Sequence, residues 1–485
     1  MRLFRLLALL TAAIVFLPTA RGNPPKGDME ITTHSPKARA LFLKGLAKME
    51  TLHVQEGLQS WRDATREDTG FALAHIYLCN FAQDPTEQVA EREKALATRK
   101  GAGAEEQLII DWLANASKGQ WIPAIQAMNE ALARYKNDKH LAWTAGWWLV
   151  LTQNEPLRAI PLFQRIIRLD PKFADAYNEL AYCYARTGNF DQAFVHIKRY
   201  TELLPNEANP QDSYAELSRM AGRFEDALTH YRASLKIDPS FIESQLGLGD
   251  TYALMGDEPR ARAEYATAIK NGTTVQGALW SLQSAATYVR EGKLVEADKA
   301  FQAAAQRAHD NDFVNLEAEA YRSMSLYQTD GAAAMDELRK AETVLEETHK
   351  VSQALVDAEL ASILRTRVER ALRNGNADLA AETVAKLEKM ADGTADANIQ
   401  LAYHGAAGAL LVSRGKYEEA ISHLEEDNRN PFSMRQLVEA YGKTGAQERS
   451  ERMAARLFGF NEPLIEQAVA VPAFRQTWAA RVPKN

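Results

Sequence analysis

Apolar residues recur along the middle of the chain with the period of an α-helix. The clearest unit begins at Ala174, and the apolar residues of its first helix share one helical face: Tyr177, Leu180, Ala181 and Tyr184. Gly188 ends this helix, because glycine adopts a positive φ at little cost, and Pro205 ends the next one. Between them lies a second apolar stripe, formed by Ala193, Ile197 and Tyr200. The pattern predicts a helical hairpin.

This hairpin repeats at a fixed interval of 34 residues. Proline, glycine and alanine all recur at that interval: Pro171, Pro205 and Pro239; Gly188, Gly222 and Gly256; Ala159, Ala193, Ala227 and Ala261. The interval, together with small residues at the eighth and twentieth positions and proline at the thirty-second, resembles the tetratricopeptide repeat. The resemblance implies an all-α fold, a right-handed superhelical solenoid of about a dozen helix-turn-helix repeats.

Looser copies of the pattern extend the array in both directions. N-terminal and central repeats are predicted over residues 36–311, an irregular region with longer helices over 312–395, and regular repeats again over 396–460. Residues 461–485, which carry Phe474 and Trp478, are predicted to form a capping helix and tail that cover the last exposed face. We expect a bend or an altered groove in the irregular region.

The start of the chain differs in kind from the repeats. Two arginines precede an apolar run over residues 6–17, and small residues follow at Ala20 and Gly22. This pattern predicts a signal peptide over residues 1–22, cut after Ala20 or Gly22, and a linker over residues 23–35. The apolar run is shorter than the about 20 residues that cross a bilayer. We therefore expect an exported protein of the bacterial periplasm or the extracellular space, without stable membrane insertion after signal cleavage.

Charge and cysteine content narrow the class of protein. The formal net charge is −7, with 64 acidic against 57 basic residues, so nucleic acid is not an expected partner. The two cysteines, Cys79 and Cys183, are separated by about three repeats. That separation exceeds the roughly 7 Å between Cα atoms that a disulfide spans. We expect two buried free thiols and a fold that is stabilised by its core alone.

The sequence carries no recognisable catalytic motif. HExxH, CxxC, GxSxG and GxxxxGK do not occur in it, so we expect no catalytic residue, no metal site and no cofactor. Gly247 and Gly249 lie within a predicted helix, which favours helix packing over dinucleotide binding. Equivalent atoms of neighbouring repeats are about 10 Å apart, too far to share one ion. We therefore expect surface positions for three histidines that share the twenty-third position of their repeats: His196, His230 and His423.

The resemblance also assigns a groove. In the tetratricopeptide family the first helix of each repeat lines the concave side, through its second, fifth, ninth and twelfth positions. In the best-registered copies these positions are mostly acidic or amide residues: Asp175, Asn178, Tyr182, Asn209, Asp212, Glu216, Arg219, Glu243, Leu246 and Asp250. We expect an acidic groove. Its predicted ligand is an extended, basic or neutral segment of a protein or peptide partner, held by charge-assisted bonds to the carboxylates and by backbone contacts to Asn178.

Trp143 and Trp147 are a second candidate part of the groove. If Gly146 is the small eighth residue of its repeat, both tryptophans point into the groove. A register anchored on Pro171 sends them into the core instead, where large aromatic side chains commonly lie. A tryptophan exposed in the groove would anchor a peptide. The sequence leaves both registers open.

Three classes of function follow from this organisation. The leading one is a non-enzymatic scaffold that binds a protein partner. A regulatory or catalytic protein with a pocket in the irregular region would need polar residues such as His309 and Asp312 to meet a nucleophile. A self-assembling repeat protein would need an uncapped end, and Phe474 and Trp478 argue against one.

Overall fold

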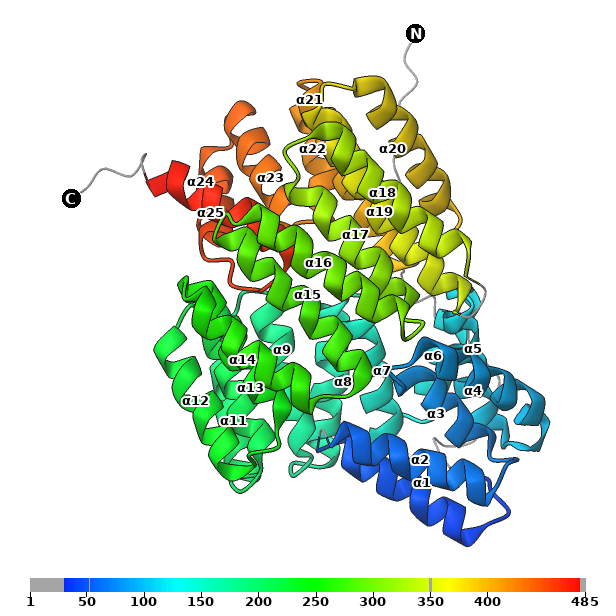
Figure 1. The fold of residues 1–485 in the computed structure, drawn as a ribbon. Coiled ribbons are helices and arrows are strands. Elements are labelled where there is room, and N and C mark those ends of the chain that lie inside the picture. Colours follow the sequence, from blue (N-terminus) through cyan, green and yellow to red (C-terminus); the bar gives the residue numbers. More distant parts are fainter. Residues whose placement is uncertain (1–29, 52, 349–350, 480–485) are drawn as a thin grey trace.

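The computed structural model describes residues 30–51, 53–348 and 351–479, and within them every regular element is a helix. The predicted signal peptide over residues 1–22 lies outside the described residues, as do the linker up to residue 29 and the tail over 480–485. The predicted all-α fold is confirmed, with 25 α-helices in the described residues (Figure 1).

The first 24 helices pair as twelve consecutive hairpins, in agreement with the predicted dozen. The odd-numbered helix comes first in each pair. The hairpins of the first half are α1 (Pro36–Met49) with α2 (Val54–Glu67), α3 (Ala72–Phe81) with α4 (Pro85–Thr98), α5 (Ala104–Ser117) with α6 (Trp121–Arg134), α7 (Lys139–Leu151) with α8 (Pro156–Leu169), α9 (Ala174–Arg186) with α10 (Phe190–Leu203), and α11 (Ala208–Met220) with α12 (Phe224–Ile237). A short 3₁₀ turn, η1 (Arg99–Gly101), follows α4.

The second half continues the pairing and adds one unpaired helix, α25 (Ile465–Ala479). Within the region predicted to be irregular, α19 is 21 residues long. The remaining hairpins are α13 (Ile242–Met255) with α14 (Glu258–Asn271), α15 (Thr274–Arg290) with α16 (Leu294–His309), α17 (Val314–Tyr327) with α18 (Gly331–Glu346), α19 (Gln353–Arg373) with α20 (Ala377–Asp392), α21 (Ala397–Ser413) with α22 (Tyr417–Leu424), and α23 (Pro431–Lys443) with α24 (Gln447–Phe458).

Glycines with a positive φ close the turns between paired helices. Gly188, Gly222 and Gly256 have φ values of 82°, 75° and 83°. A residue with a Cβ atom adopts this left-handed conformation only at a cost, whereas glycine adopts it readily. The 34-residue spacing of glycine therefore marks the point at which each hairpin reverses direction.

Small residues let the two helices of a hairpin, and neighbouring hairpins, approach closely. A Cβ atom added to Gly247 on α13 would lie 2.2 Å from Cε1 of Tyr231 on α12, and one added to Gly249 would lie 2.8 Å from the ring of Tyr265 on α14. Tyrosine rings fill the space that these glycines leave. The packing role predicted for Gly247 and Gly249 is confirmed.

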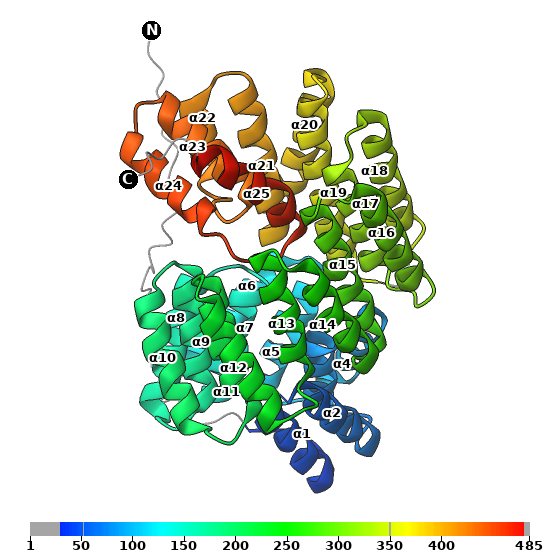
Figure 2. The same ribbon diagram turned by 60° about the vertical axis from the view of Figure 1, so that its left-hand side comes forward.

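The array curls until its later repeats meet its earlier ones. Figures 1 and 2 show α1–α14 in one half of the molecule and α15–α25 in the other, with α25 lying inside the curve of the second half. The two halves touch: α19 contacts α5, and Arg429 before α23 donates a 3.2 Å hydrogen bond to Asn154 after α7. Repeats distant in sequence therefore stabilise one another as well as their immediate neighbours.

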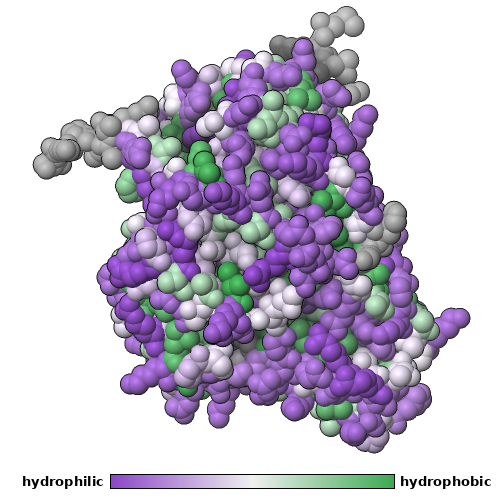
Figure 3. Space-filling model, viewed as in Figure 1, coloured by the Kyte–Doolittle hydropathy of each residue, from purple (hydrophilic) through white to green (hydrophobic). Residues whose placement is uncertain are grey.

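Apolar surface is buried between the helices. On the face drawn in Figure 3, hydrophobic residues form small separate patches among hydrophilic ones. Cys79 and Cys183 are buried free thiols, as predicted. Among the described residues, none of the helices combines the length and the apolar character needed to span a membrane.

Candidate functional site

Three carboxylates of the predicted acidic groove lie on the first helices of neighbouring repeats. Asp175 lies on α9, Asp212 on α11 and Asp250 on α13, and they are 0%, 8% and 6% exposed. Other parts of the chain cover them, so the expectation of an open acidic groove at these positions is wrong. Three more residues from the same prediction are buried: Asn178, Asn209 and Arg219. Three are partly exposed, namely Tyr182, Glu216 and Leu246, and Glu243 is exposed.

The buried carboxylates accept hydrogen bonds from side chains of nearby helices of the array. Asp212 accepts a 2.6 Å hydrogen bond from the hydroxyl of Ser244 on α13. Asp250 accepts one of 2.7 Å from the hydroxyl of Tyr265 on α14. Asn209 has the same role, because its side-chain oxygen accepts a 2.8 Å bond from the Tyr200 hydroxyl. These bonds hold successive helices in register and leave the groups unavailable to an outside ligand.

The same burial changes the charge of these groups. Loss of solvent raises the pKa of Asp175 to about 7 and that of Asp212 to about 8, and it also raises the pKa of Asp250. A carboxyl group that is neutral near pH 7 makes no charge-assisted bond. The predicted attraction of a basic segment to Asp212 therefore lacks its physical basis, and Asp250 is buried away from such a segment.

Trp143 and Trp147 occupy the positions that the Gly146 register predicts, but one of them is fully buried. A Cβ atom added to Gly146 would lie 2.5 Å from the Phe163 ring on α8, which identifies Gly146 as the small residue of its hairpin. Trp143 is 0% exposed and stacks on Phe81, 5.8 Å between ring centroids, whereas Trp147 is partly exposed. The earlier repeat thus covers Trp143, and only Trp147 reaches solvent.

A chain of polar contacts leads from the predicted groove to the end of the protein. The Tyr182 hydroxyl donates a 2.7 Å bond to Glu216, and the Arg219 guanidinium donates one of 3.0 Å to the same carboxylate. Arg219 also donates a 3.0 Å bond to the main-chain oxygen of Asn461, which is 242 residues away in sequence. Leu246 packs among the apolar residues of α11–α14.

Residues 459–479, which we call the C-terminal segment, fill the inner side of the second half of the array. Arg290 at the end of α15 donates to the side-chain oxygen of Gln467 and, at 3.5 Å, to the main-chain oxygen of Leu464. Arg322 on α17 donates a 2.8 Å bond to Glu466, with only 11% and 14% of the two side chains exposed. The sequence did not predict that Arg290 and Arg322 line this inner side, because their partners lie 144 to 177 residues further along the chain.

Helix α25 is more than the predicted cap. One of its faces, with Val471 and Phe474, packs on apolar residues of α23 and α24, as a cap of the last hairpin would. Its first turns, with Ile465 and Ala468, pack on apolar residues of α15 and α17. Helix α25 therefore joins the last hairpin to hairpins that precede it by more than 100 residues.

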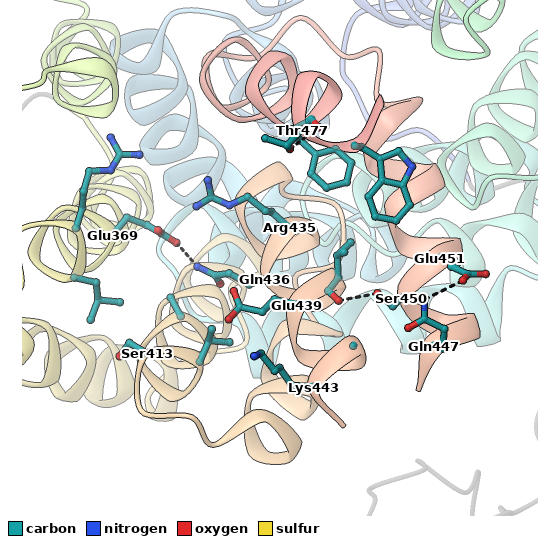
Figure 4. A pocket seen from close by; sticks show the side chains of 18 residues that line it. Glu369, Ser413, Arg435, Gln436, Glu439, Lys443, Gln447, Ser450, Glu451 and Thr477 are labelled. Atoms are coloured by element: carbon teal, nitrogen blue, oxygen red, sulfur yellow. Dashed lines mark hydrogen bonds between the residues drawn. The ribbon is translucent and has the colours of Figure 1, made fainter. Parts of the chain in front are cut away.

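A groove of about 1210 Å³ stays open beside α25, and we call it the C-terminal groove. Three first helices, α19, α21 and α23, form its floor and one side, and α24 and α25 form the other side (Figure 4). Because α19 belongs to residues 312–395, the irregular region supplies part of this surface. The residues that define the groove are Glu369, Arg373, Val412, Ser413, Arg435, Gln436, Val438, Glu439, Lys443, Gln447, Ser450, Glu451, Phe474, Thr477 and Trp478.

Charged side chains in the C-terminal groove are mostly free for a ligand. Within the described residues, Arg373, Arg435 and Lys443 make no ion pair with a carboxylate, although the Arg435 guanidinium lies 5.8 Å from the centre of the Phe432 ring. Glu369 accepts a 3.2 Å bond from Gln436, which Figure 4 shows across the floor. The groove therefore combines three unpaired cations with three carboxylates, those of Glu369, Glu439 and Glu451.

The candidate histidines hold helices together. His196 stacks on Tyr184 and His230 on Tyr214, and all three histidines of the twenty-third position are half-buried, less exposed than predicted. His423 lies 3.0 Å from His404, Nδ1 to Nδ1. In the part of the chain that the structure describes, three or more metal-ligating side chains do not gather at any point.

His309, considered for catalysis, is a link between two helices. Its imidazole lies 3.1 Å from the Glu317 carboxylate on α17, and 66% of its side chain is exposed. This contact raises the pKa of His309. The pair joins the end of α16 to the start of α17, where the exposure of His309 lets water reach it.

Comparison with known protein families finds matches to the central hairpins. Two family models match the chain, the tetratricopeptide repeat over residues 150–217 and the TPR repeat over residues 219–256, a stretch from the end of α7 to the end of α13. The protein is thus a solenoid of helical hairpins, and those from the end of α7 to the end of α13 are similar to tetratricopeptide repeats.

Several relatives in sequence are much longer proteins. The chain is 23% identical to human Superkiller complex protein 3 over 247 residues, which is 45% of this chain and 16% of that protein. It is 33% identical over 86 residues to the anaphase-promoting complex subunit CDC16 of Saccharomyces cerevisiae, 18% of this chain and 10% of that subunit. The chain spans 7% to 16% of the length of the Superkiller proteins that it matches.

Similar solved structures cover most of the chain at low identity. The Cut9–Hcn1 hetero-tetramer of the anaphase-promoting complex covers 87% of this chain and 76% of its own, with 14% identity and a TM-score of 0.43. Yeast Tom70 covers 85% of this chain and 96% of its own, with 14% identity and a TM-score of 0.41.

Proposed function

We propose that this protein is a non-enzymatic scaffold that binds an extended segment of a protein partner in the C-terminal groove. The observation that carries the proposal is the open groove of about 1210 Å³, lined by first helices of successive hairpins. Extended peptides bind such surfaces through backbone contacts and a few side-chain anchors. The names of two relatives, a protein of the Superkiller complex and a subunit of the anaphase-promoting complex, belong to parts of larger assemblies and support the proposal.

The groove favours a different ligand from the one that the sequence predicted. Asp212 and Asp250 are buried, so a basic segment has no acidic surface there. Glu369, Glu439 and Glu451 also line the C-terminal groove, but its three cations Arg373, Arg435 and Lys443 are in no ion pair with them, and each can bind a carboxylate of a ligand segment. Phe474 and Trp478, stacked at 5.5 Å between centroids, offer a wall for an apolar side chain. We therefore propose an acidic segment with an apolar anchor.

Site-specific crosslinking in the native host tests this proposal. A photoreactive residue at Val438, which lines the groove, should capture a defined partner, and the capture should fall at least about tenfold when Arg373, Arg435 and Lys443 are all replaced by glutamate. A photoreactive residue at Val195, exposed on α10 far from the groove, is the control. Capture of the same partner from Val195, or capture that survives the charge reversal, contradicts the proposal.

We also propose that the protein is exported, on the basis of the predicted signal peptide over residues 1–22. Cell fractionation of a tagged full-length chain and of a chain lacking residues 2–22 tests this. The full-length chain should be found outside the cytoplasm at a reduced mass, and the shortened chain should stay inside. Equal distribution of the two chains contradicts export.

A further inference from the structure

The inner faces of α15 and α17 hold a helix of the same chain. We propose that this inner face is a binding surface for an amphipathic helix that carries a carboxylate, that α25 occupies it as an internal ligand, and that a partner helix of the same pattern displaces α25. This inference goes beyond the proposed function and does not require it, because it concerns a different surface and a helical ligand.

Contacts to the C-terminal segment are of a kind that another sequence can reproduce. Arg219 and Arg290 bind main-chain oxygens, those of Asn461 at 3.0 Å and Leu464 at 3.5 Å. Main-chain oxygens are present whatever the side chains are, so these two bonds require a chain direction and no particular residue. A partner segment entering along the same path would reproduce these two main-chain bonds, whereas the bond of Arg290 to the Gln467 side chain requires an acceptor side chain at that position.

One contact, between Arg322 and Glu466, requires a negative charge on the bound helix. Arg322 pairs with Glu466 at 2.8 Å and is held by two further bonds to Glu319 on its own helix, at 2.6 and 2.8 Å. Removing the partner carboxylate would leave part of this buried guanidinium without its charge partner, which is costly. A competing helix must therefore supply a carboxylate at the position of Glu466.

Apolar contacts of α25 indicate which residue spacing a competing helix needs. Ile465 and Ala468 face α15 and α17, with Leu282 and Met324 among the residues around them. The displacing helix therefore needs an aliphatic residue, a carboxylate at the next position and a small residue three positions beyond the aliphatic one. This spacing is that of one helical face with the charge at its edge.

Three features make α25 easier to displace than a helix of the array. Pro472 lies inside α25 and removes one helical hydrogen bond. The Nε atom of Arg219 is buried without a partner among the described residues, so the C-terminal segment satisfies this arginine incompletely. The segment before α25 contains Gly459 and Pro463, and each hairpin of the array is stabilised by its own neighbours. We therefore expect the array to stay folded when α25 is released.

Displacement would also change the C-terminal groove. Phe474, Thr477 and Trp478 of α25 form one wall of that groove, while Ile465 and Ala468 of the same helix face the inner surface. A helix that replaces α25 on α15 and α17 removes this wall. Ligand binding at the inner surface is thus coupled to the shape of the groove through one helix.

A peptide-binding measurement on the full-length chain tests the inference. The probe is a fluorescently labelled synthetic peptide of residues 459–479, and the released variant is the full chain with Glu466→Lys and Val471→Asp. By fluorescence anisotropy the released variant should bind the peptide at least about tenfold more tightly than the unchanged protein does, since its own α25 no longer competes. The same peptide with Glu466→Lys should bind the released variant at least about tenfold more weakly.

Hydrogen exchange provides the second readout, and Gln476→Lys on the exposed face of α25 is the matched control. In the released variant the amides of α25 should exchange faster while those of α15 and α17 stay protected, and in the control nothing should change. Loss of protection in α15 and α17 together with α25 would overturn the inference, because α25 would then be part of the folding core. Unchanged peptide affinity in the released variant would overturn it as well.

Discussion

The indole N–H of Trp143 donates a 2.6 Å hydrogen bond to the carboxylate of Asp175, and both side chains are 0% exposed. The bond joins α7 to α9 across neighbouring repeats. Trp147 adds a second bond of 3.3 Å to the same carboxylate. A titratable group is thereby placed in the core, where its charged form is disfavoured.

Stability should therefore depend on the ionisation of Asp175. Its pKa is about 7 in the folded protein, above the ordinary value of 3.8, so between these values the folded protein binds more protons than the unfolded chain. The free energy of unfolding contributed by this group is fully present below about pH 4 and is lost as the pH rises through about 7. Asp175→Asn removes this dependence. On going from pH 4 to pH 8, the free energy of unfolding of the variant should therefore rise by about 1 to 3 kcal/mol relative to that of the parent.

Urea denaturation of parent and variant at both pH values measures the difference. Asp378→Asn, at an exposed position on α20, is the control and should leave the pH dependence unchanged. Parallel pH profiles for the parent and Asp175→Asn would show that Asp175 does not titrate in this range.

Loss of the Arg322–Glu466 pair should weaken the docking of α25. Arg322→Ala leaves a buried carboxylate without its partner, which costs about 3 to 5 kcal/mol in comparable sites. Thermal denaturation should show a lower Tm, and hydrogen exchange should show the loss concentrated in α25. Arg339→Ala is the matched control, because its pair with Asp336 is exposed, 71% and 46%, and should contribute less than about 1 kcal/mol. Equal effects of the two substitutions would contradict the prediction.

Close packing at Gly247 should make a single added methyl group costly. Gly247→Ala places a Cβ atom 2.2 Å from Tyr231 and should destabilise the protein by about 1 to 3 kcal/mol, because the ring must move. Combining it with Tyr231→Leu should recover part of the loss relative to the sum of the two single effects. Gly393→Ala is the control, because the nearest atom to a Cβ added there is 3.7 Å away. Urea denaturation should show little change in its free energy of unfolding. If Gly247→Ala left the free energy of unfolding unchanged, α12 and α13 would be able to move apart at no cost, which would contradict the prediction.

Both cysteines should be unreactive in the folded protein. Burial raises the pKa of Cys79 to about 11 and that of Cys183 to about 12, and the thiolate is the reactive form. Labelling with a thiol-specific chromogenic disulfide at pH 8 should be at least about 100-fold slower than for a cysteine introduced at the exposed Thr187. Denaturation in urea should remove the difference, and rapid labelling of both native thiols in the folded chain would contradict the burial.

Particular residues show which parts of the fold could be predicted from the sequence. The 34-residue recurrence of Gly188, Gly222 and Gly256 was sufficient to predict the hairpins, because each turn requires a left-handed residue at the same place in its unit. The same local rules predicted the packing of Gly247 and the burial of both cysteines. They did not predict that Asp212 and Asp250 would be covered, because covering depends on how closely successive hairpins approach.

The sequence by itself determined the all-α repeat and the positions at which its helices start, turn and pack, because these depend on residues within one unit and its neighbour. Only the tertiary structure decided which surface stays open. Arg219 meets Asn461 across 242 residues and Arg322 meets Glu466 across 144, and no periodic pattern relates these positions. Their contact follows from the curvature summed over many hairpins, which brings the C-terminal segment onto the inner face and leaves the groove beside it.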